Sequence, residues 1–398
     1  MNKNLWSANH PAAFWRCLSP VSEQEWEEAI RCAAPVLGLS SQAEDIHALL
    51  EWTLGEGQFG VDRWRLSSVK RLYYLLKPLL PRKLTRVMRR FYGESKQRRF
   101  PLGWPIEDRY ARFQWSIIRR IIENKGGYSL PFLHFWPEGQ HLALVLTHDV
   151  ETAEGQRFVL RVADLEQQFG YRSLFNFVPE RYHLDRAIIQ ELRERGFEIG
   201  IHGLKHDGHL FSSYAEFSRR AQKINQYLKT FHAVGFRAPL THRQPEWMQI
   251  LEIEYDLSFF DTDPYEPLPG GVMSIWPFVI GHFIELPYTL PQDYTVTNIL
   301  SETTPKTWLN KVDFLEKYYG MALVNTHPDY LIRRENWVVY TRFLEVMKER
   351  SNYWHALPRE VASWWRGRMQ AKTTDDLPQA VEGALHLSDS SLVITAKD

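Results

Sequence analysis

The chain has 398 residues, of which 44% are hydrophobic, and 48 cationic side chains balance 48 anionic ones to give no net charge. This composition excludes a disordered chain and gives no general reason to expect a nucleic-acid partner. The length allows one large domain with a smaller one beside it.

Cysteine usage and hydropathy narrow the class of protein further. The two cysteines, Cys17 and Cys32, are too few for a disulfide framework or a thiolate metal cluster. No run approaches the length of apolar chain that spans a bilayer, and the first ten residues lack the apolar core of a signal peptide. We therefore expect a cytoplasmic protein.

The first 135 residues have the pattern of helices joined by loops. Ser22 with Glu25, and Ser41 with Glu44, match the spacing of a capping box, in which two side chains satisfy backbone groups at the start of a helix. We predict a mostly helical N-terminal region over residues 1–135.

Residues 70–99 differ from the rest of this region in charge. Eleven lysines and arginines stand against one glutamate, a net charge of +10, and apolar side chains are interleaved with them. Pro78 and Pro81 divide any helix here into two. One interpretation is a basic amphipathic surface that makes peripheral contact with an anionic membrane or binds a polyanionic glycan. The other is a solvated basic face packed on the main domain.

Between residues 136 and 365, apolar runs alternate with helical patterns. The strand-like runs cover 142–148, 172–178, 197–202, 233–238, 257–261, 283–288 and 321–326, and the helical patterns cover 155–169, 185–195, 212–230, 245–254 and 306–319. Strands joined by crossover helices indicate a parallel sheet, and seven of them favour closure into a barrel. Residues 366–398 lose this periodicity and are expected to form a mobile tail, although Leu392-Val-Ile-Thr395 could pair with another strand.

Polar side chains follow the ends of most of the predicted strands. In parallel barrels the reacting groups lie at the carboxyl ends of the strands, so these side chains are expected on one rim. They are His148, Asp149, Glu151, His202, His206, Arg237, Asp261, Asp263, Asp293 and His327. If its strand continues, His148 faces opposite to Asp149, so no role is assigned to it.

Two of these residues have the spacing of metal ligands. His202-Gly-Leu-Lys-His206 follows an apolar run, and its two imidazoles can reach one ion from a helical turn or from a tight loop. A third ligand can come from the acidic end of the run 142–151. Two histidines, a carboxylate ligand and a carboxylate base outline a hydrolytic metal site.

Five short motifs occur in a fixed order between residues 141 and 357. They are Thr147-His-Asp-Val-Glu151, His202 with His206, Arg237-Ala-Pro239, Asp293-Tyr294 and Leu323-Val-Asn-Thr-His327. Each motif alone is a weak signal, but their order, spacing and position at strand ends make the set specific. In these motifs the chain resembles the polysaccharide deacetylases, a carbohydrate esterase group that includes chitin, peptidoglycan and nodulation-factor deacetylases.

The chain departs from the commonest pattern of that family at two positions. Many members carry a second aspartate directly after the first, as a metal ligand, whereas here Val150 follows Asp149. Some relatives have a carboxylate one residue later instead, and Glu151 matches that variant. The second departure is Tyr294, where tryptophan is usual.

The resemblance implies an α/β fold, namely a distorted (β/α)7 barrel of the polysaccharide deacetylase type with an N-terminal, mostly helical extension. It also implies a divalent metal held by Glu151, His202 and His206. Oxygen and nitrogen ligands of this kind favour Zn and also allow Co, Ni or Mn.

Roles for the remaining motif residues follow from the same resemblance. Asp149 is the catalytic base, and Arg237 pairs with it and holds it ionised. His327 protonates the departing amine, with Asp293 as its carboxylate partner and Asp261 as a second candidate. A backbone N–H near residues 239–241, or the metal itself, stabilises the oxyanion.

The expected function is that of a metal-dependent hydrolase that removes an acetyl group from an N-acetylated sugar of a polysaccharide or glycan precursor. The expected partner is therefore a carbohydrate substrate, with no nucleic acid. Two alternatives stay open at this point: hydrolysis of another non-peptide C–N amide bond on the same barrel, and a non-catalytic glycan-binding relative.

Overall fold

The computed structural model describes residues 5–38, 45–65, 100–127, 129–388 and 391–396. The strands are β1 Leu130–Leu133, β2 Leu142–Val150, β3 Leu174–Phe177, β4 Glu198–His202, β5 Gly235–Arg237, β6 Tyr255–Asp256, β7 Phe278–Ile280, β8 Phe283–Glu285, β9 Met321–Thr326, β10 Tyr353–His355, β11 Glu382–Ser388 and β12 Ser391–Ala396. The helices are α1 Pro11–Trp15, α2 Glu23–Ala33, α3 Ile46–Thr53, α6 Arg109–Asn124, α7 Ala153–Gln168, α8 Arg186–Glu194, α9 Tyr214–Thr230, α10 Pro245–Met248, α11 Lys306–Lys317, α12 Pro328–Leu331, α13 Arg334–Glu349 and α14 Pro358–Gln370.

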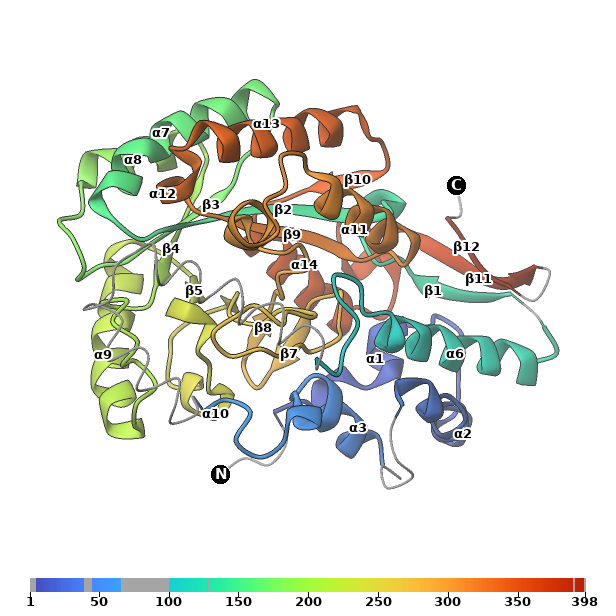
Figure 1. Ribbon diagram of the computed structural model, residues 1–398. Helices are drawn as coiled ribbons and strands as arrows, with labels where there is room; N and C mark the ends of the chain where they lie inside the picture. The colour runs from blue at the N-terminus through green and yellow to red at the C-terminus, as the bar shows by residue number, and fades with distance from the viewer. Residues whose placement is uncertain (1–4, 39–44, 66–99, 128, 389–390, 397–398) are drawn as a thin grey trace.

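A curled, mostly parallel sheet forms the centre of the molecule (Figure 1). Its strand order is β10-β2-β3-β4-β5-β6-β8-β7, with β9 also paired to β2, and only the β7–β8 pair is antiparallel within it. Each of the seven predicted strand-like runs contributes to this sheet or to its extension. The alternation of buried strands with crossover helices accounts for the parallel order, and the predicted barrel-type α/β fold is confirmed.

The sheet curls far enough for its two sides to meet beyond β8. The backbone N–H groups of Thr289 and Leu290 both donate to the carbonyl oxygen of Leu323 in β9, at 3.2 and 3.0 Å. The Thr289 hydroxyl adds a bond of 2.6 Å to the carbonyl of Met321. The chain after β8 thus lies against the strand that pairs with β2.

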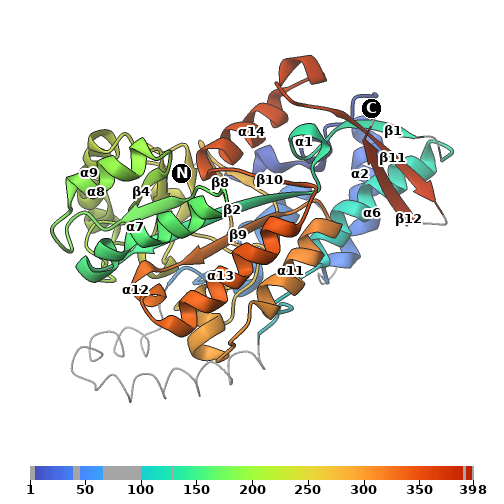
Figure 2. The same cartoon turned by 90° about the horizontal axis from the view of Figure 1, so that it is seen from above.

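Helices cover both faces of this sheet. In Figures 1 and 2, β2 and β9 lie between α13 on one side and α14 on the other. β2 is buried along its whole length, because it is enclosed on both faces. A run with hardly a polar residue before Thr147 is the sequence expected of such a strand.

Two predicted elements end earlier than expected. The helix predicted over 245–254 ends at Met248, because the N–H of Glu254 already donates to the carbonyl of Val234 at 2.8 Å and starts the next strand. The strand predicted over 257–261 begins two residues earlier, at Tyr255, and forms the short strand β6. Its extension still reaches the sheet through a parallel bridge between Phe260 and Tyr288.

The N-terminal region contains α1, α2, α3 and α6. The capping box predicted at Ser22 and Glu25 is confirmed, with bonds of 2.7 Å from the N–H of Ser22 to the carboxylate and 3.3 Å from the N–H of Glu25 to the hydroxyl. The box predicted at Ser41 and Glu44 lies outside the described residues, and α3 is capped by Asp45 instead. The basic segment 70–99 also lies outside them, so its two interpretations stay predictions.

The expectation of a mobile tail over 366–398 is corrected by a second sheet. It has the order β1-β11-β12 and is antiparallel, with Leu385 paired to Leu130. Glycine at 383 lets this strand approach the ring of Phe132, since a Cβ there would be 2.2 Å from it. A short strand of mixed polarity is hard to recognise in sequence because pairing to a partner, here β1, decides whether it forms.

The N-terminal region and the barrel share aromatic contacts. The ring of Trp276 lies 4.8 Å from that of Phe14 and 5.7 Å from that of Trp115. Buried Arg368 in α14 donates to the backbone carbonyls of Phe14, Leu133 and His134 at 2.7, 2.7 and 2.8 Å. The division of the chain into 1–135, 136–365 and 366–398 as separate domains stays a prediction.

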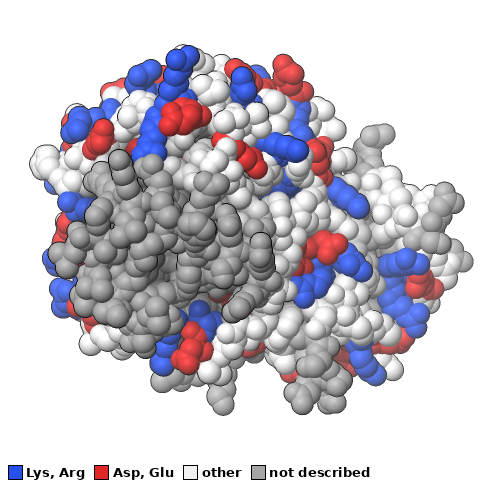
Figure 3. All heavy atoms as spheres, in the orientation of Figure 1, with Lys and Arg blue, Asp and Glu red and all other residues white. Residues whose placement is uncertain are grey.

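The surface matches the balanced composition. On the face seen in Figure 3, cationic and anionic side chains are intermixed over the white surface outside the grey atoms. No helix in the described part of the chain combines the length and the apolar character needed to cross a bilayer.

Candidate metal centre and active site

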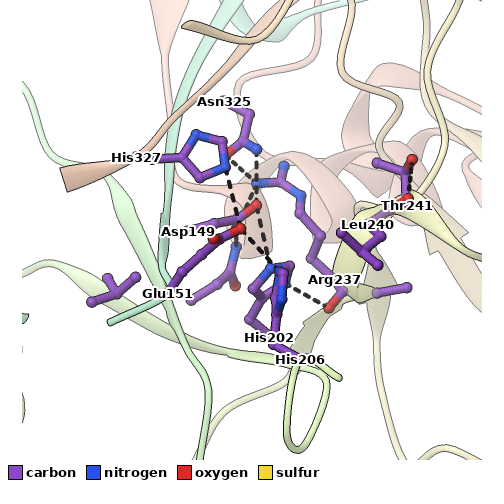
Figure 4. A network of polar contacts seen from close by, with 12 residues as sticks. Asp149, Glu151, His202, His206, Arg237, Leu240, Thr241, Asn325 and His327 are labelled. Atoms are coloured by element: carbon purple, nitrogen blue, oxygen red, sulfur yellow. Dashed lines mark hydrogen bonds and ion pairs between the residues drawn. The ribbon is translucent and has the colours of Figure 1, made fainter. Parts of the chain in front are cut away.

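Four strands bring the predicted polar residues to one end of the barrel (Figure 4). Asp149 is the second-last residue of β2, and Glu151 comes directly after that strand. His202 ends β4, Arg237 ends β5 and His327 comes directly after β9. Because these strands are parallel, their carboxyl ends lie at the same rim. The residues of all five sequence motifs therefore meet in space.

Glu151, His202 and His206 form a compact group of metal-binding type. One ligand atom from each lies within 4.8 Å of the other two. The Nε2 atom of His206 is 2.9 Å from Oε1 of Glu151, yet it is buried without a partner in hydrogen-bond geometry. Two lone pairs brought together in this way are what a shared cation between them requires, so the donor set fits a divalent metal.

His202 is held in the form that binds metals. Its Nδ1 is 3.1 Å from the carbonyl oxygen of Arg237, which places the proton on Nδ1 and leaves the lone pair of Nε2 directed at the group. Burial lowers the pKa of His202 to about 4, against the opposing effect of Asp149. The imidazole is therefore neutral near pH 7, as a metal ligand must be.

His206 lies in a loop and not in a helical turn, which decides between the two arrangements left open by the sequence. Its φ of 52° is in the left-handed region, and Gly203 before it has a φ of 62°. A Cβ at Gly203 would be 2.3 Å from the ring of Pro239. Asp207, the next residue, binds Arg220 of α9 through two bonds of 2.8 and 2.9 Å, which anchors the loop.

Asp149 is buried and surrounded by donors. Its Oδ1 accepts hydrogen bonds from Arg237 (3.1 Å) and Asn176 (3.0 Å), and its Oδ2 accepts one from Asn325 (2.8 Å). Oδ2 also lies 3.9 Å from Nε2 of His202, so it faces the metal group. Burial raises the pKa of Asp149, but Arg237 above all, with the two nearby histidines, holds it well below its usual range.

Arg237 crosses the barrel interior to reach Asp149. Its guanidinium donates to the carbonyl of Leu257 (2.9 Å), the side chain of Asn325 (2.6 Å) and the hydroxyl of Thr147 (3.1 Å). With 1% of its surface exposed, the cation is enclosed, and these partners satisfy its donors. The predicted pairing with Asp149 is present.

His327 stands across the site from the two metal-type histidines and is paired with Asp293. Its Nδ1 is 2.8 Å from Oδ1 of Asp293, whose Oδ2 accepts the backbone N–H of His327 at 2.8 Å. Nε2 points back into the site, 3.8 Å from Oε1 of Glu151. Burial lowers the pKa of His327, but the carboxylates around it, Asp293 first and then Glu151 and Asp149, together outweigh burial and raise the pKa to about 10.

The structure also decides between the two carboxylates considered for this pairing. Asp261, the second candidate, forms a buried ion pair with Lys311, at 2.7 Å, and burial raises its pKa to about 6. His148 faces away from the site, as the strand alternation predicted. Its ring nitrogens lie 2.7 Å from Thr326 and from Glu166.

Sequence reasoning missed several residues that shape the site. Asn176 and Asn325 both donate to Asp149, and each is a polar residue inside an apolar strand, a signal that could have identified them. Asp329 accepts a bond from the N–H of Glu151 at 3.0 Å and another from Thr152. Nothing in the local sequence marks Asp329 for this position, because its contact spans 178 residues of chain.

The Asp293-Tyr294 motif lies where the chain enters a π-helix, Thr295–Ile299. The ring of Tyr294 is 5.4 Å from that of Tyr330, which in turn is 4.8 Å from the ring of His327. Tyr294 thus belongs to an aromatic group beside His327.

No family model and no curated protein matches the sequence. Among solved structures, a putative polysaccharide deacetylase from Mycobacterium smegmatis shares 18% identity, with 58% of this chain and 92% of that one covered, at a TM-score of 0.48. A probable polysaccharide deacetylase from Pseudomonas aeruginosa PAO1 shares 16% (58% and 94% covered, TM-score 0.49), and the Puue allantoinase shares 15% (58% and 93%, TM-score 0.49).

The chain is similar to solved polysaccharide deacetylases. The side chains of this chain combine a metal-type group, an enclosed carboxylate and a paired histidine at one rim.

Proposed function

We propose that this protein is a metal-dependent hydrolase that removes an acetyl group from an N-acetylated sugar of a polysaccharide or glycan precursor. The observation that carries the proposal is the convergence of Glu151, His202 and His206 next to two further groups, Asp149 and His327. Amide hydrolysis needs a proton acceptor for water and a proton donor for the leaving amine, and these two residues each lie within 4 Å of a member of the metal-type group.

Glu151, His202 and His206 would hold a divalent ion, for which one oxygen and two nitrogen ligands favour Zn. When bound, such an ion lowers the pKa of water and polarises a carbonyl group. Three protein ligands leave further coordination positions open, which is typical of catalytic rather than structural zinc sites.

Asp149 is the proposed proton acceptor. Arg237 and the two asparagines hold it ionised and in one orientation, with Oδ2 toward the metal group. A carboxylate whose charge and position are set in advance needs no reorganisation when it accepts the proton of the attacking water.

His327 is the proposed proton donor. Asp293 holds the proton on Nδ1 and favours the imidazolium, so that Nε2 carries a proton toward the site at neutral pH. As the carbon–nitrogen bond of the acetamido group breaks, this proton passes to the nitrogen and the sugar leaves as an amine.

The first experiment combines metal analysis with an assay of acetate release. We expect the purified wild-type chain to bind about one zinc ion and to release acetate from N-acetylglucosamine oligomers, with cyclic amides as a comparison substrate. Glu151→Ala and His202→Ala should lose the metal and the activity together. Glu154→Ala is the matched control, because Glu154 is an exposed carboxylate three residues from Glu151 in the first turn of α7.

The outcomes separate the three functions considered. Metal without acetate release, but with hydrolysis of cyclic amides, would favour the other amide hydrolase. Absence of metal in the wild type, with unchanged glycan binding in His327→Ala, would favour a non-catalytic glycan-binding protein.

A further inference from the structure

One cation stands directly beside the candidate metal group. Nη1 of Arg181 is 4.0 Å from Oε2 of Glu151, and 35% of the arginine side chain is exposed. The other oxygen of Glu151 faces His206 and His327, at 2.9 and 3.8 Å. Arg181 therefore approaches the group from the solvent side.

The loop that carries Arg181 is anchored on both sides of it. The N–H of Glu180 donates to the carbonyl of Leu204 (2.8 Å), and the hydroxyl of Tyr182 donates to the carbonyl of Val150 (2.6 Å). Leu204 follows β4 and Val150 ends β2, the strands that deliver His202 and Glu151. The base of the Arg181 side chain is thus placed by the same framework as the metal group.

The charge around Arg181 is not balanced. Glu180 is already taken by Lys223 (2.9 Å) and Lys205 (3.8 Å). Within the described chain, Glu151 is the one carboxylate within 4.0 Å of the Arg181 guanidinium. Once Glu151 serves as a metal ligand, Glu180 is the one carboxylate in the described chain that pairs with any of the three cations, and both of its partners are lysines, so Arg181 has no carboxylate of its own.

We propose that Arg181 selects substrates that carry an oxyanion, a carboxylate or a phosphate, close to the acetamido group that is cleaved. The proposal rests on the proposed hydrolase function and names its substrate class: an acidic N-acetylated sugar unit. A guanidinium presents a planar fork of donors that matches both oxyanions, and it holds them most strongly where no protein carboxylate competes. The partly exposed guanidinium also attracts an anionic substrate to the rim.

The experiment compares one sugar with and without a negative charge. The probes are N-acetylglucosamine, its 3-O-lactyl ether, which adds a carboxylate, and its 6-phosphate. We expect the zinc-loaded wild type to have a lower KM for at least one anionic probe than for the neutral sugar. Arg181→Gln should raise that KM by roughly 10- to 100-fold, the usual range for a lost hydrogen bond to a charged group, and this increase should be larger than any change in the KM of the neutral sugar. The two anionic probes distinguish a carboxylate from a phosphate source.

A binding measurement adds a readout that does not depend on turnover. Calorimetric titration with glucosamine and glucosamine 6-phosphate should show tighter binding of the phosphate by the wild type and equal binding of the two by Arg181→Gln. Arg186→Gln is the matched control, since it removes an exposed arginine at the start of the neighbouring helix α8. It should leave every value unchanged.

The failure of this proposal differs from the failure of the proposed function. Acetate release from the neutral and the charged sugars with the same KM, in wild type and Arg181→Gln alike, would overturn the role of Arg181 and leave the hydrolase intact. An Arg181-dependent preference for the charged amine without any acetate release would support the anion site and overturn the proposed reaction.

Discussion

Asp149 and Glu151 show how two carboxylates of one strand end acquire different properties. They lie two residues apart, on the same side of the chain, but Asp149 is saturated by three donors whereas Glu151 faces histidine lone pairs and an outer arginine. A carboxylate already occupied by donors is a poor metal ligand, and one opposite two imidazoles is a good one. This contrast supports Glu151, and not Asp149, as the metal ligand.

Replacement of His327 tests whether proton donation and metal binding belong to different residues. We expect His327→Asn to bind zinc as the wild type does, because His327 lies outside the ligand group, while kcat falls by about 10²- to 10⁴-fold, the range for loss of a general acid. Zinc content and steady-state kinetics measure the two effects. His232→Asn, a change at an exposed histidine just after α9, serves as the control. A kcat within threefold of wild type for His327→Asn would contradict the assignment.

The loop after β4 is the element that the site depends on most. It delivers His206 in a left-handed conformation, which costs free energy unless neighbouring contacts hold it. The two-bond contact between Asp207 and Arg220 of α9 supplies such a contact, and Glu216 holds Arg220 from the same helix at a second point. The ligand thus owes its position to a helix outside the site.

Asp207→Asn should therefore weaken metal binding without touching a ligand. We expect the dissociation constant for zinc to rise by about 10- to 100-fold, as is usual when a residue that supports a metal ligand is changed. Competition with a chelating dye measures it. Asp164→Asn removes an exposed acid that also pairs with an arginine, and it should bind zinc normally. Equal zinc affinity in Asp207→Asn and wild type would show that the loop holds its conformation without the two hydrogen bonds between Asp207 and Arg220.

The fold buries several titratable groups at one end of the barrel, and this burial affects the free energy of unfolding of the entire protein. His202 and His327 are both almost fully buried, yet their pKa values move in opposite directions, to about 4 and about 10. Desolvation has the largest net effect on the pKa of His202, whereas for His327 the summed effect of Asp293, Glu151 and Asp149 exceeds that of desolvation. The stability of the metal-free protein is therefore linked to pH from both sides.

The sign of this linkage follows from the ordinary histidine pKa of 6.5. As pH falls from about 6.5 to 4, the unfolded chain binds a proton that folded His202 does not, so the free energy of unfolding decreases. As pH rises from about 6.5 to 10, folded His327 keeps a proton that the unfolded chain has lost, so it decreases again. Each group changes the free energy by at most about 1.4 kcal/mol per pH unit.

Urea unfolding of the metal-free protein at pH 4, 6.5 and 10 tests this expectation. The wild type should be most stable near the middle value. His327→Asn should lose less stability than wild type between pH 6.5 and 10, and His202→Asn should lose less between pH 6.5 and 4. Identical pH profiles for wild type and both variants would contradict the linkage.

The order of residues in the chain was enough to predict the barrel-type fold and the residues gathered at its rim. Apolar runs with crossover helices between them leave few ways to bury their surfaces other than a parallel sheet, and the carboxyl ends of parallel strands share one rim. The local pattern of apolar and polar residues therefore predicted which side chains gather at the rim. These are Asp149, Glu151, His202, Arg237 and His327, which all lie at or directly after strand ends.

Which of these groups touch depends on the packing of the folded chain. Asp293 is the first candidate for the partner of His327 and Asp261 the second, and in the fold Asp293 pairs with His327 whereas Asp261 pairs with Lys311. The contact of Asp329 with the N–H of Glu151, the position of Arg181 beside Glu151 and the pairing of β11 with β1 were likewise outside the reach of local patterns. Each depends on the register and curl of the sheet, which are set by packing between residues far apart in the chain, and a local pattern carries no information about that packing.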